Sequence, residues 1–384
     1  MIRLLKKADC CGCGACRQSC PKNCITLEPD EEGFLYPKVD EAICINCGLC
    51  EKVCPMLAKQ EPSPRGVNAY AAYTPDDQTR ERSSSGGVFS ALAADILNRG
   101  GVVAGAAFDE DFSVRHILVE KDQELHRLRG SKYVQSRMED SYIQIQQLLK
   151  QGRVVLFTGV SCQVAGLKAF LNREYENLYT VDVLCHGVPS PKVWSHYFRE
   201  QEAAHGQRLR GVSFRDKRNS WRKYSICLTF EDGTEYCRPN AEDAYLRVFL
   251  ADLCLRPSCH SCRFKEFPRL SDLTIGDAWG VEKHMPDWND DRGTSLVMVN
   301  SPKGQDWWDA VAENLVFRAG DLDTLLPKSA DSRRSVRPHA NRSRFFAALD
   351  RGERMEQLVK LTRKSPYRRL LSFGKRTLKK LLRK

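Results

Sequence analysis

The sequence begins with a cysteine pattern that occurs twice. In each copy four cysteines follow one another at intervals of three, three and four residues, and a proline comes directly after the fourth. Both copies lie within the first sixty residues, a segment too short to fold on a hydrophobic core alone. The pattern therefore predicts that residues 1–60 fold around groups bound by the cysteines.

The spacing Cys-x-x-Cys-x-x-Cys-x-x-x-Cys-Pro is typical of ferredoxins that bind two 4Fe-4S clusters. Three closely spaced cysteines hold one cluster, and the fourth reaches across to the other. A pair of zinc sites would need two pairs of thiolates each, and would not explain a triplet followed by Cys-Pro. The predicted ligands are Cys10, Cys13, Cys16 and Cys54 for one cluster, and Cys44, Cys47, Cys50 and Cys20 for the other.

The seventeen cysteines do not indicate a secreted disulfide scaffold. No apolar run approaches the roughly 18 residues that span a bilayer, and Met1–Asp9 is too short and too basic for a cleavable signal. We therefore expect a cytoplasmic protein whose cysteines act as thiolate ligands. Cys11 and Cys24 fall outside the repeat and are predicted to be small buried residues.

From residue 67 onward short apolar strands alternate with amphipathic helical stretches, which indicates a mixed α/β region. An antiparallel patch is expected at Arg210–Cys237, which contains an Asp232-Gly233 turn. Trp307 and Trp308 are predicted to be core residues. The predicted strands are Val67–Tyr73, Gly101–Phe108, Arg153–Thr158, Tyr179–Leu184 and Ser295–Asn300, and the predicted helices include Ala241–Leu253 and Gly304–Leu315.

Single cysteines recur at turns in this second region. Cys162 and Cys185 each follow a predicted strand, at the edge where open α/β sheets collect their ligands. Cys254, Cys259 and Cys262 lie together in CLRPSCHSCRF. These cysteines either converge on one site, or are buried thiols beside half of a zinc knuckle. The spacing alone leaves both interpretations open.

Several segments resemble the coenzyme F-420 hydrogenase/dehydrogenase beta subunit family, over residues 67–300. They are SSSGGVFSALAADIL (83–97), LRGSKYVQS (128–136), FTGVSCQVAGL (157–167), VDVLCHGVPSP (181–191) and CHSCRFKEFPRLSDLTIGDAWG (259–280). The resemblance implies a flavoprotein oxidoreductase, because family members bind FAD beside a 4Fe-4S cluster. They pass electrons between iron-sulfur centres and a two-electron carrier or substrate.

The resemblance also implies a third 4Fe-4S cluster. Its ligands would be Cys162, Cys185, Cys259 and Cys262, and Cys254 is the alternative if one of these does not bind. Many relatives carry Thr-Pro before the first of these cysteines, where this chain has Val160-Ser161. That difference leaves the turn less rigid than a proline would make it.

Two further segments are expected to bind FAD. The small residues that precede the helix at 88–97 suit its pyrophosphate, because a helix N-terminus offers unpaired amides, although a serine string is also an ordinary N-cap. Lys132 could neutralise phosphate or the reduced flavin, or could be a solvated surface lysine. The predicted cofactor-binding residues are Ser84, Ser85, Gly86, Gly87, Lys132 and Tyr133.

Asp277 and His186 are the predicted catalytic residues. Asp277 could hydrogen-bond the isoalloxazine or a substrate, and could equally cap a helix. His186 could shuttle protons, or could orient the turn that carries Cys185.

These patterns predict an α+β fold, in which a two-cluster ferredoxin-type domain precedes a larger mixed α/β flavin and iron-sulfur domain. The predicted segments are the ferredoxin domain (1–60), a linker (61–66), the N-terminal part of the flavin region (67–175), the C-terminal part with the third cluster (176–335), and a helical segment with a basic tail (336–384).

The net charge of +11 resides in residues 360–384, which contain eleven Lys and Arg and no acid. Leucines at helical spacing among these cations predict a basic amphipathic helix, whose partner would be an anionic membrane surface such as the inner face of the cytoplasmic membrane. A solvated helix is the alternative. No nucleic-acid-binding module accompanies the tail, so nucleic acid is not an expected partner.

Two functions remain open at this point. One is an oxidoreductase that receives electrons from a ferredoxin or reductase subunit and acts at FAD on a small-molecule or glycan-linked substrate, since some relatives accompany polysaccharide synthesis. The other is a non-catalytic ferredoxin-type electron-transfer subunit that docks on a separate enzyme. The flavin content separates the two.

Overall fold

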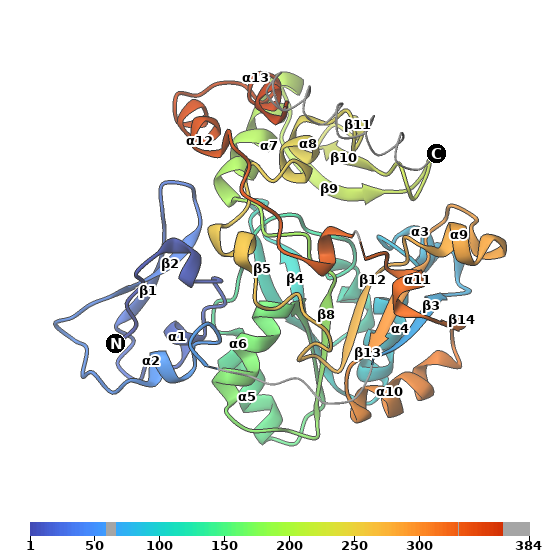
Figure 1. Cartoon of the computed structure of the whole chain (residues 1–384), viewed down its shortest axis with the longest axis horizontal. Helices are drawn as coiled ribbons and strands as arrows, with labels where there is room; N and C mark the ends of the chain where they lie inside the picture. Colours follow the sequence, from blue (N-terminus) through green and yellow to red (C-terminus); the bar gives the residue numbers. More distant parts are fainter. Residues whose placement is uncertain (59–66, 329, 364–384) are drawn as a thin grey trace, which may run out of the picture.

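The computed structural model describes residues 1–58, 67–328 and 330–363. Figure 1 shows a small N-terminal domain, a large sheet with helices on both faces, and a smaller sheet with its own helices. The predicted linker at 61–66 and the basic tail from residue 364 onward lie outside the described residues. In the described part of the chain, no helix has both the length and the apolar character to cross a bilayer.

The N-terminal domain has little apolar core. Its own small cluster of buried residues consists of Ile2, Ile25, Cys24 and Cys50, and most of the residues packed around them are further cysteines. Gly14 and Gly48 cap its two short helices with φ of 73° and 75°, a backbone conformation that glycine adopts without steric cost. The elements are η1 (Lys7–Asp9), α1 (Ala15–Gln18), β1 (Ile25–Pro29), β2 (Leu35–Val39) and α2 (Leu49–Lys52).

A nine-stranded sheet forms the centre of the molecule, in the order β14-β3-β13-β12-β8-β7-β4-β5-β6. Four neighbouring strands, β12, β8, β7 and β4, run parallel, so their carboxyl ends share one edge. The strands are β3 (Asn68–Tyr73), β4 (Val102–Phe108), β5 (Val114–Val119), β6 (Ser136–Arg137), β7 (Val155–Val160), β8 (Leu178–Val183), β12 (Leu273–Asp277), β13 (Ser295–Val299) and β14 (Val316–Gly320).

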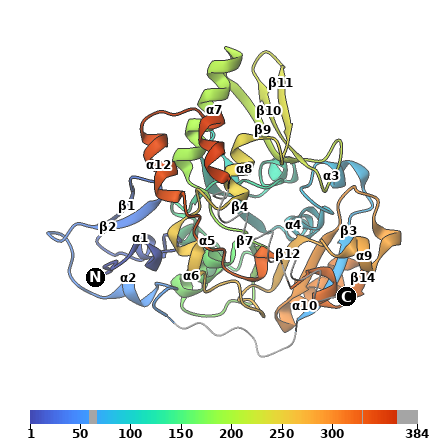
Figure 2. The same ribbon diagram turned by 45° about the horizontal axis from the view of Figure 1, so that its top comes forward.

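Helices cover both faces of this sheet (Figures 1 and 2). The helices α4 (Val88–Asn98) and α10 (Pro302–Ala312) pack in one apolar cluster, which contains Trp307 and Trp308 as predicted. The helices α5 (Ser141–Lys150) and α6 (Ser161–Leu171) pack in another, which includes Cys13 of the N-terminal domain. The N-terminal domain therefore docks on the α5–α6 side.

The smaller sheet consists of β9 (Leu209–Asp216), β10 (Ser225–Phe230) and β11 (Glu235–Pro239), all antiparallel, as predicted for Arg210–Cys237. Cys227 and Cys237 form a disulfide across β10 and β11, so these two cysteines depart from the expectation that the cysteines act as thiolate ligands and not as disulfides. The accompanying helices are α7 (Pro191–His205), α8 (Ala244–Leu250), α12 (Arg342–Asp350) and α13 (Met355–Leu358).

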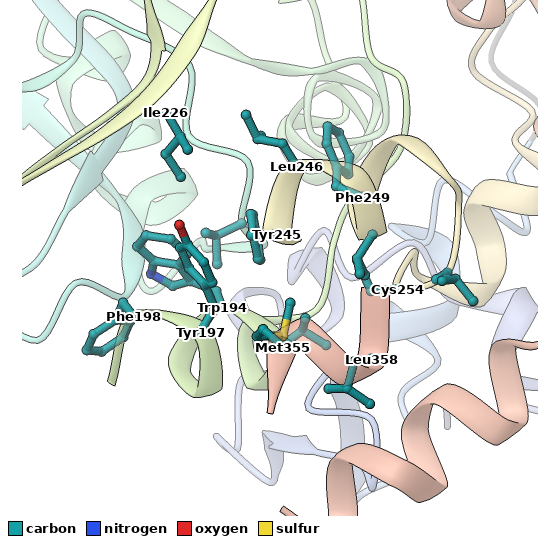
Figure 3. Close-up of a cluster of buried hydrophobic side chains, with 14 of the residues drawn as sticks. Trp194, Tyr197, Phe198, Ile226, Tyr245, Leu246, Phe249, Cys254, Met355 and Leu358 are labelled. Atoms are coloured by element: carbon teal, nitrogen blue, oxygen red, sulfur yellow. The ribbon is translucent and has the colours of Figure 1, made fainter. Parts of the chain in front are cut away.

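An aromatic cluster packs the smaller sheet against its helices (Figure 3). Trp194, Tyr197 and Tyr245 are at most 1% exposed, and Phe34 of the β1–β2 hairpin belongs to the same cluster. The hairpin is thereby anchored in the large domain. The remaining elements are α3 (Asp77–Glu81), η2 (Asp122–Arg127), η3 (Pro257–Ser261), α9 (Val281–His284), η4 (Pro286–Trp288), α11 (Leu322–Leu325), η5 (Asp331–Arg333) and η6 (Val359–Thr362).

The predicted elements agree with the structure within a few residues. The four strands predicted between Val67 and Leu184 are β3, β4, β7 and β8, and Ser295–Asn300 is β13. The helix predicted at Ala241–Leu253 is shorter, because Asp243 caps α8 by accepting a hydrogen bond from the N–H of Leu246.

Candidate iron-sulfur and flavin site

One group of four cysteines, which we call the distal set, lies on the side of the N-terminal domain away from the large domain. Its members line a single small cavity. Cys47 is exposed, whereas Cys50 is buried and its Sγ accepts a hydrogen bond from the N–H of Ile2 at 3.2 Å. Backbone amides that donate to cysteine sulfur are typical of iron-sulfur sites. The distal set is Cys20, Cys44, Cys47 and Cys50.

The other ferredoxin-type group, the proximal set, faces the large domain. The thiol of Cys16 lies close to those of Cys10 and Cys54, and burial together with these neighbours raises its pKa. The N–H of Gly12 donates to the Sγ of Cys10 at 3.4 Å. The proximal set is Cys10, Cys13, Cys16 and Cys54.

The proximal set contacts α6 directly. A Cβ atom built at Gly166 would lie 2.8 Å from the Cβ of Cys13, so any larger residue would push the two domains apart. Nearby, the side-chain oxygen of Gln18 accepts a hydrogen bond from the N–H of Tyr142 at 2.8 Å. Arg17 pairs with Asp140 at 2.7 Å. These contacts fix the N-terminal domain with one cysteine group inward and one outward.

A third group of cysteines comes together from three places in the large domain. Cys162 follows β7, Cys185 follows β8, and Cys259 and Cys262 lie in and directly after η3. Burial and the nearby thiols of Cys259 and Cys262 raise the pKa of Cys185 to about 12. The N–H of Val188 donates to the Sγ of Cys259 at 3.4 Å. We call these four cysteines the third set.

No three sulfurs of the third set lie within 4.8 Å of one another. In the described part of the chain, the one group of three or more ligand atoms within 4.8 Å of one another is Asp216 with Cys227 and Cys237. A zinc ion with bonds of about 2.3 Å draws its thiolates closer together than that limit. The wider spacing suits an iron-sulfur cube.

Cys11 lies between the proximal and third sets, a position that no spacing rule marks in the sequence. Its thiol is hydrogen-bonded by those of Cys13 and Cys162, which holds its pKa well below the usual range. Cys24 is buried beside Cys20, with the two sulfurs 3.3 Å apart. The expectation of a small buried residue thus holds for Cys24, whereas Cys11 is half-buried and lines a large cavity.

Cys254 lies apart from the third set. It is fully buried in the aromatic cluster of Figure 3, and burial raises the pKa of its thiol to about 12. Its backbone carbonyl accepts a hydrogen bond from the N–H of Ser190 at 3.0 Å. Its surroundings are those of a core residue.

A cavity of about 530 Å³ opens at the shared carboxyl edge of β4, β7, β8 and β12. Open α/β sheets bind ligands at this edge, and the volume is in the range of cofactor pockets. Cys162 and Cys185 of the third set line the cavity, and so do Cys11 and His186. Of the residues predicted to bind FAD, the lining includes Ser84, Ser85, Gly87, Lys132 and Tyr133.

The turn before α4 lies at the N-terminus of this helix and lines the cavity. Gly87 caps the helix with φ of 87°. The hydroxyl oxygen of Ser84 accepts a hydrogen bond from the N–H of Ser131 at 2.8 Å. Gly86 faces the sheet instead of the cavity, because a Cβ there would lie 2.4 Å from the carbonyl oxygen of Ala72. Its N–H donates to the hydroxyl of Ser295 at 2.9 Å.

Lys132 is a cation held at the cavity by backbone carbonyls. Its Nζ donates to the carbonyls of Arg127 and Arg129 at 3.0 and 2.8 Å. Burial lowers its pKa to about 7. It therefore gains or loses a proton near neutral pH, unlike a solvated surface lysine.

Asp277 ends β12 and is already paired. Arg215 contacts both its carboxylate oxygens at 2.9 and 3.2 Å, and the indole N–H of Trp221 donates to one of them at 3.0 Å. Asp277 therefore caps no helix. Tyr133, the other predicted residue here, packs its ring 4.8 Å from that of Phe249.

Two histidines line the cavity in different surroundings. The Nε2 of His186 lies 2.8 Å from a carboxylate oxygen of Asp252. His116, which the sequence patterns did not mark, is buried between the hydroxyl of Ser136 at 2.7 Å and the carbonyl of Thr158 at 3.1 Å. Burial lowers the pKa of His116 to about 4, so its ring is neutral at physiological pH.

Comparison with protein families agrees with this geometry. Residues 9–58 match the 4Fe-4S dicluster domain, so the chain is an iron-sulfur electron-transfer protein. Residues 69–141 and 152–324 match the N-terminal and C-terminal domains of coenzyme F420 hydrogenase/dehydrogenase, beta subunit. The chain belongs to this family of oxidoreductase subunits, as the sequence resemblance indicated.

Among solved structures, the chain is similar to one chain of the F420-reducing [NiFe] hydrogenase complex from Methanosarcina barkeri, solved as a xenon derivative. The identity is 17% and the TM-score 0.45, over 79% of this chain and 93% of that one. Comparison with curated proteins gives no match.

Proposed function

We propose that this protein is an iron-sulfur flavoprotein. It relays single electrons from a redox partner protein to FAD, which passes them in pairs to a two-electron carrier or to a small-molecule or glycan-linked substrate. One observation carries the proposal. Cys162 and Cys185 of the third set line the same cavity as the turn suited to a pyrophosphate.

The three cysteine sets are the proposed 4Fe-4S ligands, and each set supplies four thiolates. They follow one another from the surface to the cavity. The distal set includes the exposed Cys47, the proximal set packs on α6 through Cys13, and the third set reaches the cavity through Cys162 and Cys185. Cys11 lies between the proximal and third sets. This order suits entry of electrons from a partner at the distal set.

The cavity fits FAD by its donor chemistry. The α4 N-terminus and the hydroxyl of Ser84 suit the pyrophosphate, and Lys132 supplies a positive charge. The hydroxyl of Ser85 lines the cavity but donates to the carbonyl of Thr294 at 3.0 Å. Tyr133 offers an aromatic surface beside them. Gly86 serves this site through packing, since it brings the turn against β3 and β13.

The contacts of Asp277 and His186 assign them separate tasks in this proposal. Asp277 orients Arg215 at the cavity wall, because both its oxygens are committed to that guanidinium and to Trp221. His186 is hydrogen-bonded to Asp252 at one ring nitrogen and lines the cavity. It is the group available to hold or move a proton there.

Flavin released by acid from anaerobically purified protein tests the proposal. We expect about one FAD per chain, identified by chromatography, because the chain has one such cavity in its described part. No flavin after reconstitution would contradict the proposal and favour the non-catalytic electron-transfer subunit.

Two glycines that flank α4 give a matched pair of variants. Gly87→Ala would place a Cβ 2.6 Å from Thr74 at the pyrophosphate turn, and we expect a loss of FAD. Gly100→Ala, beyond the other end of the helix, has similar backbone strain at φ of 67° and no atom within 4 Å. It should keep its FAD. Equal flavin content in the two variants would show that the turn does not bind it.

A further inference from the structure

A buried arginine lies where the N-terminal domain meets the turn that carries Cys259. Arg256 is 0% exposed. Its Nε donates to the backbone carbonyl of Cys10 at 2.8 Å, and one Nη donates to that of Leu35 at 2.9 Å. Its own carbonyl accepts a hydrogen bond from the N–H of Cys259 at 2.9 Å. Arg256 thus contacts one residue of the proximal set and one of the third set.

The charge of Arg256 has no acid as its partner. In the described part of the chain, its hydrogen-bond acceptors are two carbonyls and the side-chain oxygen of Gln135, at 3.4 Å. The guanidinium also lies over the ring of Tyr36, 4.2 Å from its centroid. A buried cation without an anion is strongly destabilising. The compensating negative charge must therefore come from groups that the protein binds, or from thiolates.

The thiolates are placed to supply it. The sulfurs of Cys10, Cys11 and Cys259 lie near enough to the guanidinium to interact with its charge. The surroundings of Arg256 are also tightly packed. A Cβ atom at Gly12 would lie 2.6 Å from Gln135 and 3.0 Å from the guanidinium.

A second arginine between the same domains shows what a purely structural contact looks like here. Arg342 forms an ion pair with Glu32 of the β1–β2 hairpin and donates to the carbonyl of Leu255 at 2.7 Å. Its charge is neutralised by that carboxylate. Docking of the hairpin therefore does not require an unpaired cation, and Arg256 calls for a different explanation.

We propose that Arg256 is a positioning residue that raises the reduction potentials of the two inner clusters, those of the proximal and third sets. Reduction adds one electron to a cluster, and a buried positive charge beside its sulfurs stabilises the more negative state. The distal cluster has no contact with Arg256 and keeps its potential. This inference rests on the proposed ligand sets.

Redox titration with dithionite, followed by EPR on the loaded full-length protein, tests this. In Arg256→Gln, which keeps a donor but not the charge, the reduced-to-oxidised ratio of the inner clusters at a fixed potential should fall at least about tenfold, or 59 mV for a one-electron couple. The distal signal should not move. Arg256→Lys should stay close to wild type, and so should Glu32→Gln/Arg342→Met, which removes the neutral pair.

Unchanged inner potentials in Arg256→Gln would overturn the inference, and so would an equal fall in Arg256→Lys, which keeps the charge. Arg256→Met replaces the Gln variant if that protein does not fold. Iron and flavin are counted in every sample. A wild-type protein without a third cluster or FAD would contradict the proposed function, whereas full loading with unmoved potentials contradicts only the role of Arg256.

Discussion

In the N-terminal domain the eight cysteines of the distal and proximal sets lie in two short segments of the sequence. The third set is instead gathered from positions as distant as 162 and 262. The N-terminal domain buries few apolar residues besides its cysteines. The α/β domain has a nine-stranded sheet with large apolar clusters. In the first region the bound clusters must organise the chain, and in the second the fold is built without the cysteines and then positions them.

Removal of iron should separate the two regions most strongly. With a chelator under anaerobic conditions, we expect residues 1–58 to unfold, because structural metal binding contributes on the order of 10 kcal/mol to such small domains. The α/β domain should stay folded on its apolar core. Limited proteolysis followed by mass spectrometry measures this, with cleavage expected inside residues 1–58 and protection of residues 67–328. Equal cleavage of both regions would contradict the comparison.

A single substitution in the third set should have a smaller and local effect. Cys259→Ser should remove about four irons per chain and leave about eight, without unfolding the α/β domain. Cys254→Ser, five residues earlier in the sequence, is the matched control. It should keep all its iron and lose about 1–3 kcal/mol of stability, because a hydroxyl replaces a fully buried thiol. Iron analysis and thermal unfolding distinguish the two, and the reverse pattern of iron loss would make Cys254 the ligand.

The same contrast explains how much the sequence could predict. The distal and proximal sets follow from spacing, because their ligands are neighbours in the chain. The strands follow from apolar periodicity, and Cys162 and Cys185 were recognisable as strand-end cysteines. Their union with Cys259 and Cys262 was one of two interpretations that the spacing left open, and only the family resemblance favoured it, since no local pattern links residues so far apart in the chain.

The residues that sequence reasoning missed all act through partners distant in the chain. Arg256 contacts Cys10 and Leu35, and His116 contacts Thr158. Asp277 was recognised, but its partner Arg215 lies on another strand, so the ion pair between them was not predicted. Only the fold brings such pairs together. The misses accordingly concentrate at the cavity and at the domain junction.

The proposed flavin site is built mainly from the α/β domain, and Cys11 and Gly12 of the N-terminal domain complete its lining. Its sharpest test is the pH dependence of FAD binding through Lys132. In the free protein Lys132 is charged below about pH 7 and neutral above it. A bound pyrophosphate raises this pKa in the complex. FAD binding therefore takes up a proton above pH 7, and the affinity should be constant below pH 7 and fall by up to about tenfold per pH unit above it.

Substitutions of Lys132 distinguish the effect of its charge on FAD binding from the effect of its side-chain shape. Lys132→Met should bind FAD more weakly at pH 6 and show no fall between pH 7 and 9, whereas Lys132→Arg stays charged and should bind tightly throughout. His116 adds nothing in this range, because its pKa is about 4. Lys217, whose pKa is also lowered to about 7 by burial, donates to the carbonyl of Ser85 but does not line the cavity. Lys217→Met should thus keep the pH dependence of FAD binding. Fluorescence titration of the apoprotein with FAD measures the affinity of the wild type and of the three variants. If Lys132→Met retained the fall with pH, the proton would belong to another group and Lys132 would have no part in holding the anion.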